Sequence, residues 1–219
     1  RQGEAITLRR LEVSNPQLRI AGAGALDEAI RVEARLANLG LIVPELPGAL
    51  AAQGTLRQQG DRIGVDLAAT GPGGAQARIA GTVSSDFGNA DLRMTGTGEA
   101  AIANPFLRTR SVRGPVRFDL AMQGAPGLDA ISGRVDLTDA SLADPKLGMR
   151  LDGLRLGAVL DHGRVGVDAA GNFAAGGQLR AQGAISLVGA RPLDLAVTLD
   201  DVDTFDGDAL IGRVDGDDG

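Results

Sequence analysis

The sequence predicts an all-β protein, in which an elongated, curved antiparallel sheet forms an open, U-shaped groove and is built from repeated strand groups. Three observations lead to this fold class. Apolar and polar residues alternate with period two along most of the 219 residues, which is typical of strands with one apolar and one wet face. Turns rich in Gly, Pro, Asn and Asp separate the alternating runs. The apolar residues are small, and one pair of runs occurs twice.

The alternating runs predict the strands in order along the chain. In the run that begins at Arg62, Ile63 and Val65 share one face while Asp66 lies on the other, because successive side chains of a strand leave opposite faces. Runs of this kind lie near residues 5–13, 17–26, 49–58, 62–69, 75–83, 90–98, 112–122, 131–137, 147–151, 154–160, 164–170, 178–187 and 193–199.

Residues 26–40, "LDEAIRVEARLANLG", are ambiguous between helix and strand. They are good helix formers, and several apolar residues lie four apart, as on one face of a helix. Yet Ile30, Val32, Ala34 and Leu36 also alternate with charged residues, and strands are predicted on both sides. A strand is therefore the predicted structure, with a helix as the alternative.

A stretch of 23 residues occurs twice, at an offset of 102. The first copy, 62–84, reads "RIGVDLAATGPGGAQARIAGTVS", and the second, 164–186, reads "RVGVDAAGNFAAGGQLRAQGAIS". Ten positions are identical without a gap, and they include Arg, Asp and Gln as well as Gly and Ala. Repeated strand groups that extend one sheet are typical of repeat proteins. The copies are thus predicted to be equivalent strand pairs in one continuous sheet, and residues 1–219 to be one β-groove fragment of a longer protein.

The small apolar residues favour an open sheet over a closed sandwich. The chain has 33 Gly, only five Phe, and no Tyr or Trp, so its side chains would fill the roughly 10 Å gap of a sandwich poorly. An apolar face that stays open would instead bind a passenger. The residues predicted to line this groove are Ile63, Val65, Leu67, Val116, Phe118, Leu120, Val135, Leu137, Val165, Val167, Ile185, Leu187, Leu193, Leu195 and Val197.

Composition excludes several classes of function. The net charge of −6 and the lack of a basic cluster argue against a nucleic-acid partner. Without Cys there can be no disulfide or thiolate site, and no run of about 18 uncharged apolar residues predicts a spanning helix. We therefore expect no catalytic residues and no cofactor, and we do not expect an enzyme.

No motif indicates a metal or nucleotide site. His162, the single His, lies in the turn "DHGR" and lacks the partners of a triad or a His-based zinc site, so an exposed turn residue is predicted. The glycine strings "AGAGAL" and "TGTGEA" open no helix, and they predict bends in the sheet rather than phosphate loops. Acidic residues gather near the end of the chain, at Asp201, Asp203, Asp206 and Asp208. Their spacing departs from that of an EF-hand, so solvated turns are predicted, with a weak calcium site as the alternative.

Three segments resemble the repeat region of the TamB family, the B subunits of the translocation and assembly module. They are residues 103–137, "ANPFLRTRSVRGPVRFDLAMQGAPGLDAISGRVDL", residues 39–56, "LGLIVPELPGALAAQGTL", and residues 70–81, "TGPGGAQARIAG". The resemblance implies a β-taco sheet with an apolar interior and kinship with AsmA-like and bridge-like lipid transfer proteins. It also implies a periplasmic location, an inner-membrane anchor that this sequence does not include, and an outer-membrane barrel partner of the TamA type.

The sequence therefore suggests a transport groove that acts in outer-membrane biogenesis. The resemblance implies two roles, phospholipid transport between membranes and assembly or secretion of outer-membrane proteins, with a phospholipid or a hydrophobic polypeptide as passenger. The alternative is a structural β-solenoid stalk of a secreted or surface protein. Stalks of the parallel β-helix kind favour short coils with ladders of Asn, Ser or Thr. With five Asn, long runs and a repeat near 100 residues, the sequence favours the groove.

Overall fold

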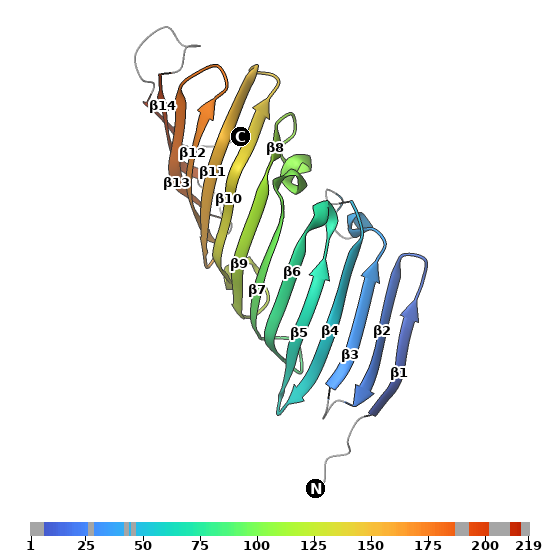
Figure 1. Ribbon diagram of the computed structural model, residues 1–219. Helices are drawn as coiled ribbons and strands as arrows, with labels where there is room; N and C mark the ends of the chain where they lie inside the picture. Colours follow the sequence, from blue (N-terminus) through green and yellow to red (C-terminus); the bar gives the residue numbers. More distant parts are fainter. Residues whose placement is uncertain are drawn as a thin grey trace. The chain divides into compact units, whose positions relative to one another are not determined.

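The computed structural model describes residues 7–25, 29–41, 44, 47–186, 193–201 and 211–215, and confirms an all-β fold of open antiparallel sheet (Figure 1). Within these residues the only helical elements are short 3₁₀ turns, and none of them could cross a membrane. The chain divides into two compact units. The N-terminal unit comprises Arg1–Thr97 and Ala121–Pro126, and the C-terminal unit comprises Gly98–Leu120 and Gly127–Gly219.

In the N-terminal unit each strand pairs antiparallel with the next in the sequence, so β1 to β7 lie side by side in chain order (Figure 1). The strands are β1 (Thr7–Ser14), β2 (Leu18–Ala25), β3 (Ala29–Leu36), β4 (Leu50–Gln59), β5 (Arg62–Thr70), β6 (Gln76–Ser84) and β7 (Ala90–Glu99), with 3₁₀ turns η1 (Leu39–Leu41) and η2 (Pro72–Gly74). The sheet is a single layer: of its described hydrophobic side chains, only Ile30 and Ala90 are buried.

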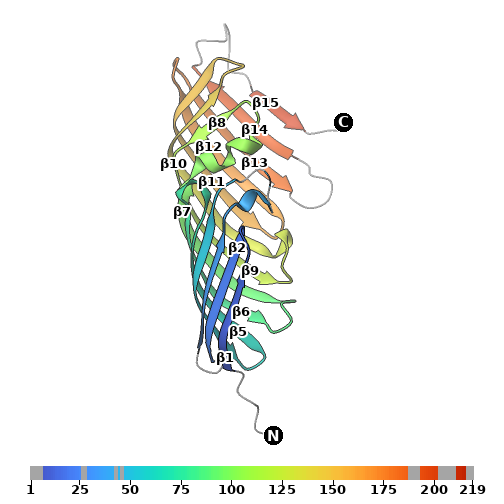
Figure 2. The same ribbon diagram turned by 90° about the vertical axis from the view of Figure 1, so that its right-hand side faces the viewer.

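The C-terminal unit repeats this plan, with the order β9 to β15 and the short β8 paired to the end of β10. Figure 2 shows the twist of the sheet from β10 to β14. The elements are η3 (Ala100–Phe106), β8 (Ser111–Arg113), β9 (Pro115–Gly124), η4 (Leu128–Ala130), β10 (Ile131–Asp144), β11 (Met149–Asp161), β12 (Arg164–Phe173), β13 (Gln178–Ser186), β14 (Leu193–Asp200) and β15 (Ile211–Asp215).

The ambiguous stretch 26–40 forms a strand, as predicted. Strand β3 occupies Ala29–Leu36, and Ile30, Val32 and Ala34 alternate with exposed neighbours; residues 26–28 lie outside the described part. The alternation prevails over helix propensity because β3 pairs on both sides, with β2 and with β4.

Several boundaries differ from the predicted ones. The run 131–137 continues as β10 to Asp144 through register shifts between Leu137 and Leu142, and β15 was not predicted. At two further places backbone conformation explains the difference. The runs 147–151 and 154–160 are one strand, β11, in which Gly153 takes a φ of +58° and the register shifts between Asp152 and Arg155. This is a β-bulge, which interrupts the alternation without ending the strand. The run 112–122 is instead divided into β8 and β9 at Gly114, where φ is +131°.

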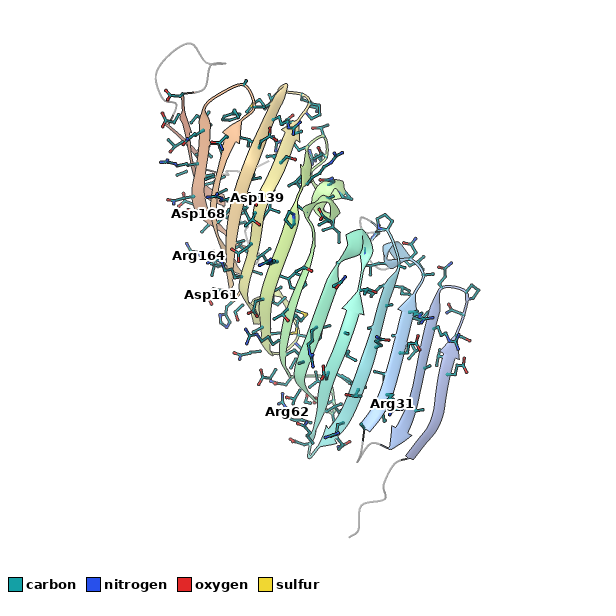
Figure 3. The ribbon with its side chains drawn as sticks, viewed as in Figure 1. Arg31, Arg62, Asp139, Asp161, Arg164 and Asp168 are labelled. Carbon is teal, nitrogen blue, oxygen red and sulfur yellow. The ribbon has the colours of Figure 1, made fainter. Side chains whose placement is uncertain are left out.

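The two sequence copies fold as equivalent strand pairs, which confirms that part of the prediction. Arg62 pairs with Ser84 in the hairpin β5–β6, and Arg164 pairs with Ser186 in β12–β13. The register at every described pair keeps the offset of 102. Figure 3 shows Arg62 and Arg164 at the corresponding ends of their hairpins. The two pairs belong to different units.

Candidate apolar binding face

The candidate site is the apolar face of the sheet, on which the predicted groove residues lie. On β5, Ile63, Val65 and Leu67 are half-buried while Asp66 is exposed, and on β12, Val167 is half-buried while Asp168 is exposed. Half-burial without a covering layer means that the side chains shield one another but leave their outer surface open. We call this surface the apolar face, and the opposite surface the polar face.

Register arranges the apolar face of the N-terminal unit into rows that run across the strands. One row is Val32, Gly54, Leu67, Ile79 and Met94, and the next is Ile20, Ala34, Ala52, Ala69, Ala77 and Gly96. Beyond the second row, Leu36 pairs with Leu50 and with Leu18. A row of alanines therefore crosses β3 to β6 with larger side chains on both sides of it. All members of these rows are half-buried. Gly22 on β2, which pairs with Val32, and Ile30, in a further row, are buried.

The C-terminal unit carries corresponding rows, and the predicted residues lie in them. Val135, Ala158, Val167, Gly183 and Leu195 form one row, and Leu137, Leu156, Ala169, Ala181 and Val197 form the next. A third pairs Leu160 with Val165 and Val165 with Ile185. Val116, Phe118 and Leu120 are half-buried on β9. Leu187 and the side chain of Leu193 lie outside the described part of the chain.

A glycine on the apolar face recurs close to the backbone of a neighbouring strand, in four of five cases beside an Asp-Leu pair, and the sequence reading missed this motif. A β-carbon on Gly54 would lie 2.0 Å from the carbonyl oxygen of Asp66, and one on Gly183 would lie 2.0 Å from that of Asp194. The same holds within 2.2 Å for Gly24 with Ala29, Gly81 with Asp91, and Gly133 with Asp119. No side chain fits at these points, so the neighbouring strands close in there. The sequence signal is the recurrent Asp-Leu, at 66–67, 91–92, 119–120 and 194–195.

The polar face is a lattice of short, exposed ion pairs and hydrogen bonds. Arg78 Nη2 donates to Asp66 Oδ2 at 2.9 Å, and Gln182 Nε2 donates to Asp168 Oδ2 at 2.6 Å. A hollow of about 770 Å³ on this face is lined by Arg31, Asp66 and Arg78 among others. Another, of about 760 Å³, lies beside Asp168 in the C-terminal unit. Both hollows are open to solvent and have charged side chains at their walls.

In the C-terminal unit the chain covers part of its own apolar face. Ala100 of η3 packs into a cluster with Val112, Leu137, Ala140 and Leu154, all of them buried. Two hydrogen bonds hold the segment against β8 and the residue after it. The Ala100 N–H donates to the Gly114 oxygen at 2.8 Å, and the Val112 N–H of β8 donates to Asn104 Oδ1 at 2.7 Å. Sequence reasoning did not anticipate this cover, because "AAIANPF" has no alternation to mark its partner.

Residues considered for metal or catalytic chemistry lie apart from the apolar face. His162 is an exposed turn residue, as predicted, and its Nδ1 lies 2.5 Å from Asp161 Oδ1. Asp201 is exposed after β14, while Asp203, Asp206 and Asp208 fall outside the described residues. Within the described ranges no group of three or more His, Cys, Asp or Glu side chains is placed to hold a metal. The strings "AGAGAL" and "TGTGEA" lie in β2 and at the end of β7, and Gly24 marks one of the close approaches between strands.

The chain was compared with protein-family models, with curated proteins and with solved structures. None of the three comparisons finds a match.

Proposed function

We propose that the apolar face binds the acyl chains of phospholipid and carries them between membranes, as part of a periplasmic protein of the TamB kind. The observation that carries this proposal is the single-layer sheet of the N-terminal unit, whose apolar side chains are half-exposed across the described strands. Exposed apolar surface of this extent is costly in water and usually marks a binding surface.

The form of the face favours a chain-like, flexible passenger. The alanine row runs across the strands from Ala34 through Ala52 and Ala69 to Ala77, so a methylene chain lying along it would contact one strand after another. Neither Tyr nor Trp is present to form a shaped pocket, and the described rows of this face consist of Ala, Gly, Val, Leu, Ile and Met. Such a surface suits transport, in which the passenger has to slide, better than tight recognition.

The resemblance to the TamB family gives the proposal its setting. By this resemblance the protein would act in the periplasm, in association with the inner membrane, and would join an outer-membrane barrel of the TamA type. A hydrophobic polypeptide is the competing passenger, in outer-membrane protein assembly. A parallel β-helix stalk, the alternative structural role, is disfavoured because the described strand pairs are antiparallel.

The test is site-specific photo-crosslinking in cells, with the probe placed in turn at positions 63 to 68. Phospholipid adducts should form with period two, strongest at 63, 65 and 67, because those side chains lie on the apolar face. Uniform labelling, or labelling strongest at 64 and 66, would reject the proposal. Adducts with polypeptide alone would reject phospholipid and identify a protein passenger.

A further inference from the structure

The end of the C-terminal unit that carries η3 exposes two apolar side chains on adjacent loops. Phe106, at the end of η3, is 54% exposed, and Leu147, between β10 and β11, is 64% exposed. Ser111 pairs with Ala143 where β8 meets β10, so the segments before Ser111 and after Ala143 leave the sheet side by side (Figure 1). The two apolar tips therefore project from the same end of the unit.

The two loops that carry these tips contain three cations. Residues 106–110 and 144–148 contain Arg108, Arg110 and Lys146 but only one carboxylate, Asp144. Arg110 Nε donates to Asp144 Oδ2 at 2.8 Å, and Asp144 Oδ1 accepts the N–H of Lys146 at 3.1 Å, so one aspartate fastens both loops together. This local excess of positive charge contrasts with the net charge of −6 on the chain.

The opposite end of the same unit has a different character. Its described turns precede β10 and follow β11, and they carry Asp129 and Asp161 beside His162. Positive charge and exposed apolar side chains thus coincide in the two loops beside β8, while exposed Asp200 and Asp201 lie at the same end of the unit but at the far strand, β14.

We propose that residues 106–110 and 144–148 dock onto the surface of an anionic phospholipid bilayer. Phe106 and Leu147 would enter the boundary between headgroups and acyl chains, while Arg108, Arg110 and Lys146 would lie among the phosphates. Two separate protruding tips suit a flat, deformable bilayer, whereas a stable protein partner would need a larger contiguous surface. The inference does not depend on the apolar face as a lipid carrier, because it concerns a different surface.

Co-flotation of the purified chain with phosphatidylcholine vesicles, with and without phosphatidylglycerol, tests this inference. The chain should float with the anionic vesicles and not with the neutral ones, and high salt should release it. The double variant Arg108→Gly/Lys146→Gln should bind about five-fold more weakly for each cation removed. Arg108 has a φ of +55°, a conformation that glycine adopts readily, so this change removes the charge without straining the backbone.

Matched controls separate the docking surface from general stickiness. Phe106→Ser with Leu147→Ser should abolish flotation, whereas Phe87→Ser, at a turn residue 67% exposed in the other unit, should not alter it. Arg164→Gln at the opposite end should also leave flotation unchanged. Absence of flotation, equal binding to neutral vesicles, or equal losses in the controls would overturn the inference, as would binding to an acidic polypeptide such as polyglutamate in place of vesicles.

Discussion

The carbonyl oxygen of Asp66 lies so close to Gly54 that a β-carbon at position 54 would be only 2.0 Å from it. Gly54 pairs with Leu67, the residue after Asp66, so the leucine side chain stands on the apolar face directly beside the glycine. A side chain at position 54 would point into the backbone of β5. The two strands can therefore approach this closely only because position 54 is glycine. The same close approach of a glycine to an aspartate carbonyl recurs in both units, at Gly81 in the N-terminal unit and at Gly183 in the C-terminal unit.

Replacing Gly54 with alanine should therefore destabilise the N-terminal unit by about 1–3 kcal/mol, the usual cost of overpacking. Asp66 would have to move, and β4 and β5 would separate locally. Urea unfolding would measure the loss. Gly71→Ala is the matched control, since Gly71 has extended backbone and its nearest atom to an added β-carbon is 3.7 Å away. Equal effects of the two changes would show that the close approach to Asp66 is not what requires glycine at 54.

Burial under η3 should make Leu154 much more important for stability than Leu160 on the same strand. Leu154 is 6% exposed in the cluster with Val112 and Ala140, whereas Leu160 is half-buried on the apolar face. Leu154→Ala should cost about 3 kcal/mol, and Leu160→Ala about 1 kcal/mol, because the second change leaves no closed cavity. The free energy of unfolding of the C-terminal unit would measure both. Similar losses would indicate that the apolar face is covered at Leu160 as well.

The sequence predicted most strands and their faces because alternation is a local signal. Val65 and Asp66 must leave opposite sides of any strand, whatever its neighbours are. The bulge at Gly153 and the division at Gly114 were missed because each depends on how an adjacent strand pairs. The cover by η3 was also missed, since Ala100 finds its partners on β8, β10 and β11, up to 54 residues away in the chain. Whether a passenger occupies the apolar face stays a prediction.

The Arg110–Asp144 pair should stabilise the protein at neutral pH and lose this contribution in acid. The side-chain hydrogen bond from Arg110 holds the pKa of Asp144 below its ordinary value of 3.8, aided by the N–H groups of Leu147 and Lys146. A lowered folded-state pKa adds stability above the unfolded value, and this stability is lost as pH falls through the folded value. Arg110→Gln should raise the pKa of Asp144 in a carbon-13 NMR titration. Asp144→Asn should destabilise the protein slightly at neutral pH and not at the acid end; the effect is small because the Arg110 side chain is exposed. An unchanged pKa in Arg110→Gln would contradict this account.

A carboxylate on the apolar face should impair acyl binding, whereas the carboxylate of the next residue along the strand lies on the polar face and should not affect it. Val65→Asp would place a carboxylate among Leu56, Ile63 and Leu67, where an apolar chain would have to desolvate it at a cost of several kcal/mol. Binding of a fluorescent fatty-acyl phospholipid to the purified chain should therefore fall by at least about ten-fold.

Asp66→Asn is the matched control for this change, because Asp66 is exposed on the polar face and pairs there with Arg78. An exposed pair of this kind contributes about 1 kcal/mol or less, so the variant should fold and bind within about two-fold of the natural protein. The second copy offers the same comparison, with Val167→Asp against Asp168→Asn. Each copy belongs to its own unit, so parallel results would show that both units bind acyl chains on the apolar face. Equal binding by Val65→Asp and Asp66→Asn, with both variants folded, would exclude the apolar face as the acyl-binding surface.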